Sequence, residues 1–509
     1  MRKIVRLLTS KALIVTVLIL LQVIALCISI MYLASYYAYL RSFLFILSLI
    51  IGIQVINHRG NPSYKIAWII VIMAFPLFGG IFYVLFGNKK MPKKQVVQNL
   101  ASIKQMARYL KRENGYIEEL KAKDLDAYKL AYYLEEHSGF PLYTYCDTTY
   151  LSSGEMYFEC LLSELKKAKK YIFMEYFIIE EGIFFTSILE VLHEKVSQGV
   201  EVYFIYDDAG CVGKIPPHYD HKLQQMGIHC LAFNPIEPQL LIHMNHRDHR
   251  KITVIDGKVA FTGGVNLADE YINAKVVYGK WVDSGIMIQG EAVWAFALMF
   301  MQFYNFYSKD KIGNYDMYYH QNIQYDHTGY ILPYTDSPLD EEIIGENVHI
   351  SILNMAKQYV YIKTPYLICD HEVITALQLA AKMGIDVRIM LPHIPDKWFV
   401  HMVSRAYYTP LIEAGVKILE YEKGFIHSKE FISDDRVGVI GSTNMDYRSY
   451  YLHHECGVWL YDDAVILEMK RAYEKQCEEC IEIDIHHFDH ENIMTKMIQG
   501  ILRLFAPIM

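Results

Sequence analysis

A short motif that occurs twice constrains this chain more than any other feature of its sequence. The spacing H-x-K-x4-D is found at residues 249–256 and again at 427–434. An Asn follows each copy at the same separation, Asn266 after the first and Asn444 after the second. One such match arises from composition in some chains of this length, but two matches with equivalent tails indicate a duplicated functional site. The motif residues are His249, Lys251 and Asp256, repeated as His427, Lys429 and Asp434.

The residues around each motif predict a β-hairpin. Residues 252–255 are mostly β-branched, Asp256-Gly257 is a strong turn signal, and residues 259–262 have the composition of a returning strand. The second copy follows the same plan at 431–433 and 437–440. We therefore expect each His–Lys pair to lie on one face of the first arm, and each Asn to follow the second arm. Two such hairpins related by a pseudo-twofold axis would bring both copies into one cleft.

Longer stretches of the chain repeat as well. Residues 168–173 match 356–361, and an amphipathic helix and a short strand follow each, the strands at 199–202 and 384–387. The order strand, helix, strand predicts an α/β fold with a largely parallel sheet. The chain has 509 residues, enough for two such domains. We expect a duplicated pseudo-dimer with its active site at the seam.

The N-terminal part is strongly apolar. Runs at 12–34, 36–57 and 66–87 predict transmembrane helices, the second of them interrupted by Arg41. Basic residues at the N-terminus and at 89–94 both favour the cytoplasmic side of the membrane. Three complete spans would place these two clusters on opposite sides. Either one cluster is therefore not cytoplasmic, or one of the three segments is re-entrant. We expect a multi-pass protein of the bacterial cell membrane with a cytoplasmic catalytic part. The predicted organisation is a membrane anchor at 1–88, a linker helix region at 89–140, a first repeat at 141–335 and a second repeat at 336–509 with an apolar C-terminal tail.

Composition argues against two classes of partner. The net charge of −8 gives no basic bias toward nucleic acid. A lone C-x2-C at 477–480 has no second pair, which disfavours a zinc site. Further histidines near the motifs have no third ligand at fixed spacing, so we expect them to line the cleft as loop residues. These are His243, His246, His453 and His454. We expect neither a metal nor a cofactor.

Two His, two Lys and two Asn suit transfer at a phosphodiester. One neutral imidazole would attack phosphorus and form a phosphohistidine, while the other protonates the leaving alkoxide and then deprotonates the acceptor. Lys and Asn side chains would hold the non-bridging oxygens. The two motif Asp residues complete the catalytic set with a role in the turns. The predicted phosphate-binding residues are Lys251, Lys429, Asn266 and Asn444, and the supporting residues are Gly264, Ser442 and Glu455.

Two acidic residues beyond the motifs are candidates for orienting a catalytic His. Asp283 and Glu455 each follow the Asn of their copy, and a carboxylate commonly holds an imidazole in this way. The alternative is that both are ordinary surface carboxylates. Two apolar segments leave similar alternatives open. Residues 392–408 predict an aromatic helix that is either core or a lip that touches lipid, and the tail at 501–509 is expected to dock on protein or membrane.

Together these residues resemble the bacterial cardiolipin synthases of the phospholipase D superfamily. The likeness rests on the doubled motif, on Asn245, on residues 424–429 and 441–449, and on parts of the third apolar run and the tail. It implies that two phosphatidylglycerol molecules become cardiolipin and glycerol at a lipid bilayer, without metal or nucleotide. It also implies that His249 is the nucleophile and His427 the acid and base, although pseudo-symmetry leaves the reverse open.

The sequence departs from that family pattern in three places. Residues 12–34 form an extra apolar run, and Asp248 and His454 stand where Asn is frequent. A hydrolytic phospholipase D is the close rival, because only the acceptor differs, and the membrane anchor favours a lipid acceptor. The acidic balance disfavours a nuclease of the same superfamily. A non-enzymatic scaffold is disfavoured because both copies keep every motif residue.

Overall fold

The computed structural model describes two compact units of the chain. The smaller unit contains the N-terminal helices and residues 503–509, and the larger unit contains 92–235 and 246–502. Both repeats lie in the larger unit. The described residues are 20–25, 34–57, 60–75, 79–83, 87, 93–110, 115–235, 246–321, 324–326, 329–340, 342–488 and 492–508.

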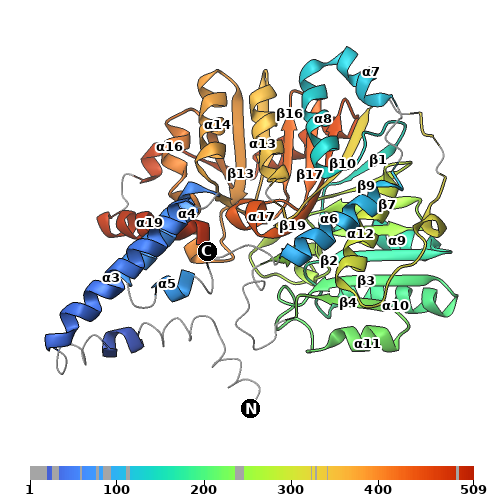
Figure 1. Cartoon of the computed structure of the whole chain (residues 1–509). Helices are drawn as coiled ribbons and strands as arrows, with labels where there is room; N and C mark the ends of the chain where they lie inside the picture. Colours follow the sequence, from blue (N-terminus) through green and yellow to red (C-terminus); the bar gives the residue numbers. More distant parts are fainter. Residues whose placement is uncertain are drawn as a thin grey trace. The chain divides into compact units, whose positions relative to one another are not determined.

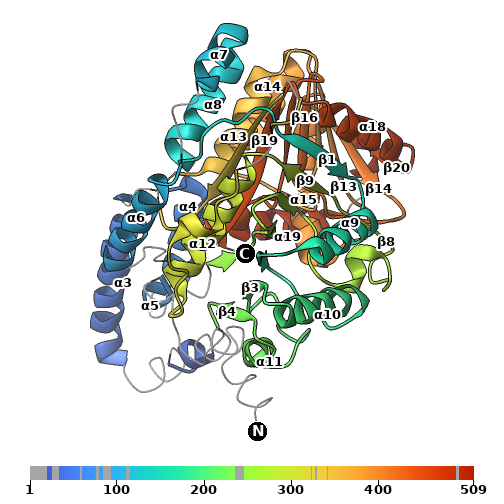
Figure 2. The same ribbon diagram turned by 90° about the vertical axis from the view of Figure 1, so that its right-hand side faces the viewer.

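The first repeat is a seven-stranded sheet in the order β1-β9-β7-β6-β2-β3-β4, drawn mainly in green in Figure 1. Helices α9, α10 and α11 lie on one side of this sheet, and α12 lies on the other (Figure 2). The strands are β1 (Asp147–Leu151), β2 (Tyr171–Tyr176), β3 (Glu201–Asp207), β4 (His229–Phe233), β6 (Ile252–Ile255), β7 (Val259–Gly263) and β9 (Gly285–Gln289). The helices are α9 (Gly154–Lys167), α10 (Ile183–Ser197), α11 (Tyr219–Gln225), η3 (Asp269–Ile272), α12 (Val293–Tyr307) and η4 (Tyr315–Tyr318).

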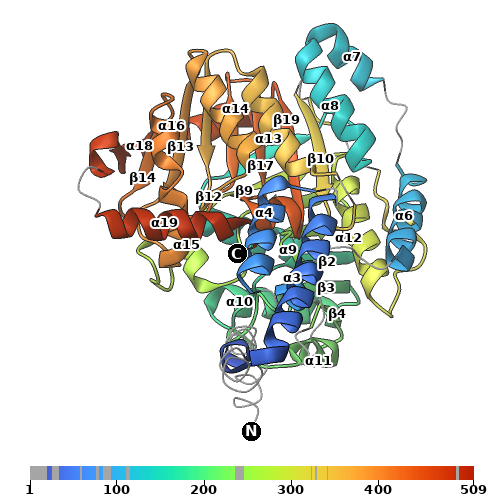
Figure 3. The ribbon, with the colours of Figure 1, turned by 60° about the vertical axis from the view of Figure 1, so that its left-hand side comes forward.

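The second repeat has the same plan, with strands in the order β10-β19-β17-β16-β11-β13-β14-β20. Helices α13 and α14 lie beside this sheet in Figure 3, and α18 lies on the opposite face in Figure 2. The strands are β10 (Tyr330–Asp336), β11 (Tyr359–Lys363), β12 (Leu367–Ile368), β13 (Asp386–Pro392), β14 (Lys417–Tyr421), β16 (Glu430–Ser433), β17 (Val437–Gly441), β18 (Met445–Asp446), β19 (His453–Tyr461) and β20 (Cys480–Ile483). The helices are α13 (Ile344–Met355), α14 (His371–Lys382), α15 (Trp398–Arg405), α16 (Tyr408–Ile412), α17 (Tyr447–Tyr451), α18 (Val465–Cys477), η5 (Ile485–Phe488) and α19 (Ile493–Phe505).

The α/β duplication is present, but the prediction of largely parallel sheets is wrong. In the strand orders given above, the parallel neighbours are β2–β3–β4 and β11–β13–β14. The motif hairpins β6–β7 and β16–β17 join them edge to edge, and a short turn can connect only antiparallel strands. Strands β9 and β19 continue the antiparallel half.

A shared hydrophobic core joins the two repeats. Helix α12 is buried along nearly its whole length, which explains why it is apolar on every side. Its core cluster also includes Ile252 and Ile288 of the first sheet and Ile432 and Val458 of the second. The expected boundary at 335 falls inside β10, which pairs with β19 of the second sheet.

The predicted linker region at 89–140 contains three helices. They are α6 (Lys93–Ala107), α7 (Tyr116–Lys123) and α8 (Leu125–Ser138). Asp124 ends α7 in an extended conformation and caps α8 by accepting hydrogen bonds from two backbone N–H groups. Helix α8 packs on the second repeat, where Tyr133 donates to Glu342 at 2.6 Å. This region is therefore part of the larger unit and not a free linker.

The smaller unit covers part of the predicted membrane anchor. Residues 36–57 lie within α3 (Ala34–Asn57), and most of the run at 12–34 lies outside the described residues. One helix through 66–87 is wrong, because α4 (Pro62–Ala74) ends before Phe75 and α5 (Gly79–Phe82) follows. The residue before a Pro disfavours helical backbone, and Pro76 comes next. Across the described ranges, no helix has both the length and the apolar character needed to span a bilayer. The C-terminal turn η6 (Ala506–Ile508) contacts α4.

Candidate active site

Two short parallel strand pairs connect the repeats and carry the motif histidines. Strand β5 (Arg247–Asp248) pairs with the start of β19, and β15 (Gly424–Ile426) pairs with β8 (Lys280–Val282). His249 follows β5, and its backbone N–H donates to the His454 carbonyl at 3.0 Å. His427 follows β15, and its N–H donates to the Val282 carbonyl at 2.7 Å. Each His therefore lies beside a strand of the other repeat.

This exchange places a carboxylate from the opposite repeat on each imidazole. Nδ1 of His249 lies 3.0 Å and 3.1 Å from the two carboxylate oxygens of Glu455. Nδ1 of His427 lies 2.6 Å from Oδ2 of Asp283. Both carboxylates are buried, which excludes the surface alternative. If each Nδ1–H donates to its carboxylate, each Nε2 is left to react.

The His–Lys pairs do not lie on the hairpin arms as expected. Residues 249–251 precede β6, and residues 427–429 precede β16. Both segments lead from the repeat-crossing strand into the hairpin and lie outside the hairpin strands. The Asn positions were predicted correctly, because Asn266 follows β7 and Asn444 follows β17.

Burial sets the electrostatics of the site. It lowers the pKa of His249 to about 3 and, with Lys429, that of His427 to about 4. Desolvation opposes ionisation of Glu455, but His249 overcomes it and holds the Glu455 pKa well below its usual range. His427 lowers the pKa of Asp283 in the same way. These shifts leave the carboxylates charged and both imidazoles neutral at pH 7.

The motif lysines belong to one electrostatic site. Burial lowers the pKa of Lys251 to about 8 and that of Lys429 to about 7. Asp283 and Glu455 both act on each of these lysines and raise its pKa. Each ammonium donates to the carbonyl of the His two residues before it. Two partly charged amines are thus held next to the two imidazoles.

The two Asn side chains have different surroundings. Asn266 accepts from the Ile178 N–H at 3.0 Å and donates to the Tyr271 hydroxyl at 2.7 Å, so part of its amide holds the fold. The Asn444 side-chain oxygen is buried and has no hydrogen-bond partner among the residues that the structure describes. Phosphate binding by both Asn residues stays a prediction, and Asn444 has more of its amide available.

The supporting residues act on the carboxylates. An added Cβ at Gly264 would lie 2.2 Å from Oδ1 of Asp283, so only Gly leaves room for that carboxylate. At the equivalent position Ser442 donates to Glu455. A small residue at this position therefore leaves room for the Asp283 carboxylate in one copy and for the longer Glu455 side chain in the other.

The motif Asp residues fasten each hairpin to its neighbouring strand. Asp256 accepts three backbone N–H groups at the start of β2, at 2.7–3.0 Å. Asp434 makes the equivalent three hydrogen bonds at the start of β11, at 2.7–3.0 Å. Both residues adopt φ of 54°, the left-handed turn conformation that Asp tolerates. These six hydrogen bonds all go to backbone N–H groups, which fits the turn role.

Several aromatic side chains around the site had no sequence signal that set them apart. Phe177 packs edge-on against His249, with ring centroids 5.1 Å apart. Tyr271 and Trp281 each lie 5.3 Å from the His427 ring. Their positions follow loops and strands that meet only after folding. The long side chain of Arg250 is also buried here and pairs with Glu175 of β2.

The remaining histidines are mostly buried in structure and not in loops. His453 and His454 start β19, and His454 packs against Phe303 and Tyr307. Ligand atoms of His249, His453 and Glu455 lie within 4.8 Å of one another, which sequence spacing did not reveal. Such a set could hold a metal ion, so the expectation of no metal stays a prediction. His243 and Asn245 lie outside the described residues.

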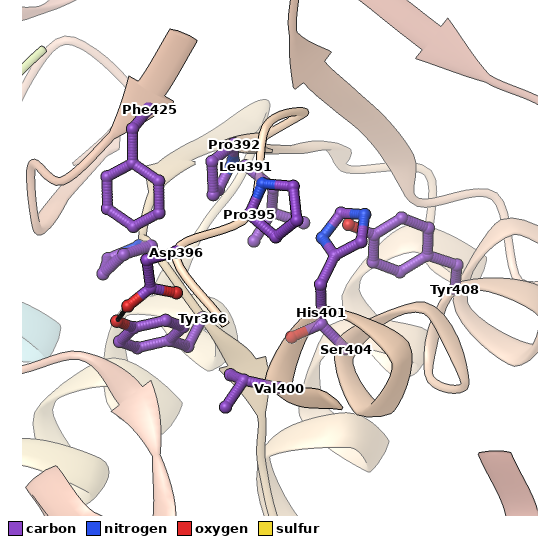
Figure 4. A pocket seen from close by; sticks show the side chains of 11 residues that line it. Tyr366, Leu391, Pro392, Pro395, Asp396, Val400, His401, Ser404, Tyr408 and Phe425 are labelled. Carbon is purple, nitrogen blue, oxygen red and sulfur yellow. Dashed lines mark hydrogen bonds between the residues drawn. The ribbon is translucent and has the colours of Figure 1, made fainter. Parts of the chain in front are cut away.

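A small cavity adjoins the His427 side of the site. It has a volume of about 10 Å³, room for roughly one water. The Tyr366 hydroxyl donates to Asp396 at 2.6 Å. Figure 4 shows these two side chains on one side of the cavity and His401 of α15 on the other. Phe425 closes one end and lies 6.1 Å from the His427 ring.

Comparison with known proteins gives this arrangement a family. The family described as "Cardiolipin synthase, PLD-like domain" matches residues 161–279 and 349–498, and "Phospholipase_D-nuclease N-terminal" matches 43–88. A relative named Cardiolipin synthase 2 from Bacillus cereus is 33% identical over 90% of this chain and 90% of its own. Cardiolipin synthase from Alkalihalophilus pseudofirmus is 32% identical over 95% of this chain and 97% of its own.

A solved structure shares the fold. Phosphatidylserine synthase from Haemophilus influenzae Rd KW20 matches with a TM-score of 0.54 and 16% identity, over 71% of this chain and 93% of that one. The duplicated sheets are therefore an arrangement already seen in a phospholipid enzyme. The chain belongs to the cardiolipin synthase family of the phospholipase D superfamily.

Proposed function

We propose that this chain is a cardiolipin synthase that transfers a phosphatidyl group between two phosphatidylglycerol molecules and releases glycerol. The observation that carries the proposal is the crossed pairing of each motif His with a carboxylate of the other repeat. That pairing prepares two imidazoles for opposite proton roles in one site. The names of the relatives support the choice of lipid substrate.

In the first step, Nε2 of His249 attacks phosphorus of the first phosphatidylglycerol. A nitrogen–phosphorus bond forms, and the bond from phosphorus to the glycerol headgroup oxygen breaks. Nε2–H of protonated His427 gives its proton to that oxygen, so glycerol leaves neutral. Lys251 and Lys429 balance the charge that develops on the non-bridging oxygens. Glu455 stabilises the positive charge that grows on His249.

In the second step, neutral His427 takes the proton from a headgroup hydroxyl of the second phosphatidylglycerol. The hydroxyl oxygen forms the new bond to phosphorus, the nitrogen–phosphorus bond breaks, and His249 returns to its starting form. The products are one cardiolipin and one glycerol. His427 must be charged in the first step, although burial in the protein alone lowers its pKa to about 4. The negative charge of the bound phosphate favours protonated His427 and so raises the pKa of its imidazole.

The same site would hydrolyse lipid if water replaced the second headgroup. The discriminating experiment uses the full-length chain in vesicles of phosphatidylglycerol labelled in the headgroup glycerol. Equal amounts of cardiolipin and released glycerol support synthesis. Phosphatidic acid without cardiolipin would assign a phospholipase D. The matched control is His249→Ala, which should release no glycerol, and a fully active variant would contradict the nucleophile assignment.

We also propose that the apolar N-terminal runs, including 12–34 and 36–57, anchor the chain in the bacterial cell membrane with the catalytic unit in the cytoplasm. Their length and composition support this location, as does the N-terminal family match at 43–88. Protease protection of right-side-out and inverted vesicles tests it. Cleavage in the 89–140 region only in inverted vesicles is expected, and cleavage only in right-side-out vesicles would place the catalytic unit outside.

A further inference from the structure

The C-terminal helix α19 exposes the side that a surface helix normally buries. Ile493 is 79% exposed, Met494 60%, Met497 57% and Ile501 54%. Their spacing places them on one side of the helix, together with Ile498 and Leu504. The buried residue of the helix is polar, because Gln499 is only 8% exposed. An ordinary surface helix has the reverse arrangement, with its apolar side against the core.

The charge of this segment selects the kind of surface that would cover it. From Ile493 to the C-terminus there is no Asp or Glu, whereas the whole chain has a net charge of −8. The basic residues are Lys496 and Arg503, both exposed and both outside the apolar side of the helix. A helix with a broad apolar side and only positive charges matches an anionic lipid surface.

The neighbouring helix α15 also has features that match a lipid surface. Helix α15 lies beside it in Figures 2 and 3, and Trp398 at the start of α15 is 66% exposed. Trp is well suited to the boundary between headgroups and acyl chains. The other side of α15 forms a wall of the cavity next to His427, described above. Trp398 therefore lies on a helix that borders the cavity next to His427, and α19 lies beside that helix.

We propose that α19 lies in the plane of an anionic bilayer surface, with its apolar side among the acyl chains and Lys496 and Arg503 at the headgroups. One consequence of this placement, that substrate reaches the site from that bilayer, rests on the proposed function. Binding of α19 to lipid itself requires no turnover. It adds a second attachment, separate from the apolar N-terminal runs.

Site-specific labelling of the full-length chain in vesicles tests the placement. Met497→Cys on the apolar side and Thr495→Cys on the other side are labelled with a nitrobenzoxadiazole dye, and the signal of the unsubstituted chain is subtracted. Quenching by doxyl-labelled lipid should be about twofold or more stronger at 497 than at 495 in phosphatidylglycerol vesicles. The difference should shrink in phosphatidylcholine vesicles and at high salt. Equal quenching at both positions would overturn the proposal, and so would a label at 497 that neither lipid nor iodide quenches, because protein would then cover the helix.

A second variant links the helix to substrate access. Met497→Glu combined with Ile501→Glu should retain the fold, since both side chains are exposed. It should lower turnover of long-chain phosphatidylglycerol in vesicles by about tenfold and leave turnover of a soluble short-chain analogue unchanged. Met317→Glu is the matched control, because Met317 is 73% exposed but lies on η4 of the first repeat. Loss with both substrates would overturn the access role. Lipid quenching at 497 without any cardiolipin formation would instead refute the proposed function and keep the placement.

Discussion

His249 and Glu455 come from different repeats, and their side chains lie 3.0 Å apart. The same exchange occurs at the other half of the site, where Asp283 of the first repeat lies 2.6 Å from His427 of the second. Neither repeat therefore supplies both a motif His and the carboxylate that contacts it. The strand pairs β5–β19 and β8–β15 create both contacts, because each His and its carboxylate stand at the positions directly after the last paired residues of β5–β19 or β8–β15.

The crossed pairs predict which His is the nucleophile. Glu455→Gln removes the charge that stabilises a phosphorylated His249, and we expect kcat to fall roughly 10²–10⁴-fold. Asp283→Asn should lower kcat similarly with natural lipid. With a phosphatidyl nitrophenol ester, whose leaving group needs no acid, Asp283→Asn should form the phosphoenzyme at a normal rate. Rapid alkaline quenching measures this step. Normal phosphorylation in Glu455→Gln and slow phosphorylation in Asp283→Asn would assign the nucleophile to His427.

Replacing Gly264 should disturb the Asp283 carboxylate by steric contact. In Gly264→Ala the new methyl group would lie 2.2 Å from Oδ1 of Asp283, so the carboxylate must leave the position in which it contacts His427. We expect activity to fall at least about tenfold and the free energy of unfolding to fall by roughly 1–3 kcal/mol, as for other overpacked sites. Gly313→Ala is the control, because nothing lies within 4 Å of its added Cβ. Equal activity of the two variants, measured with matched amounts of folded protein, would contradict this account.

The local parts of this architecture could be read from the sequence. Hairpins β6–β7 and β16–β17 begin and end within a residue of the predicted strands, because the β-branched runs and Asp turns are local signals. The sheet type was predicted wrongly, since strand partners are chosen across the fold. His453 was expected in a loop for the same reason. It starts a buried strand that packs beside His249, with ring centroids 5.3 Å apart.

The sequence predicts which residues form the site, but it does not predict which carboxylate contacts which motif His. The doubled motif identifies His249 and His427, whereas no spacing reveals that Glu455 serves the His of the other repeat. Aromatic neighbours such as Phe177 and Trp281 are invisible for the same reason. Gly264 was selected by its place in the motif, and its physical role became clear only from its distance to Asp283.

The motif Asp residues are expected to affect stability more than catalysis. Asp256→Ala leaves three backbone N–H groups at β2 without their acceptor, at a cost of roughly 1–3 kcal/mol for each buried group that water cannot reach. Asp434→Ala should cost less, because two of its three N–H partners lie in an exposed setting. Thermal unfolding in detergent and kcat per folded molecule separate the effects. A fall of 10²-fold or more in kcat with an unchanged unfolding midpoint would instead make Asp256 catalytic.

Metal dependence can be tested at the cluster of His249, His453 and Glu455. We expect activity to survive prolonged dialysis against a chelator, because Glu455 is already engaged by His249 and the proposed chemistry needs no metal. His453→Gln should keep activity within about tenfold of the unsubstituted chain. Activity that is lost with chelator and restored by Zn²⁺ would identify the cluster as a metal site.

The pH dependence follows from three depressed pKa values. The ratio kcat/KM reports ionisations of the free enzyme, in which the pKa is about 4 for His427, about 7 for Lys429 and about 8 for Lys251. Each group acts in its protonated form, and each loses its proton as pH rises. We therefore expect kcat/KM to fall as pH increases and to fall more steeply above about pH 7, as the lysines also deprotonate. Bound phosphate favours all three protonated forms, so kcat should fall at a higher pH than kcat/KM. In Lys429→Arg the added steepness near pH 7 should disappear, because arginine keeps its charge. A value of kcat/KM that rises between pH 6 and pH 8 would show that a group must lose its proton in this range, contrary to the roles assigned to His427 and the lysines.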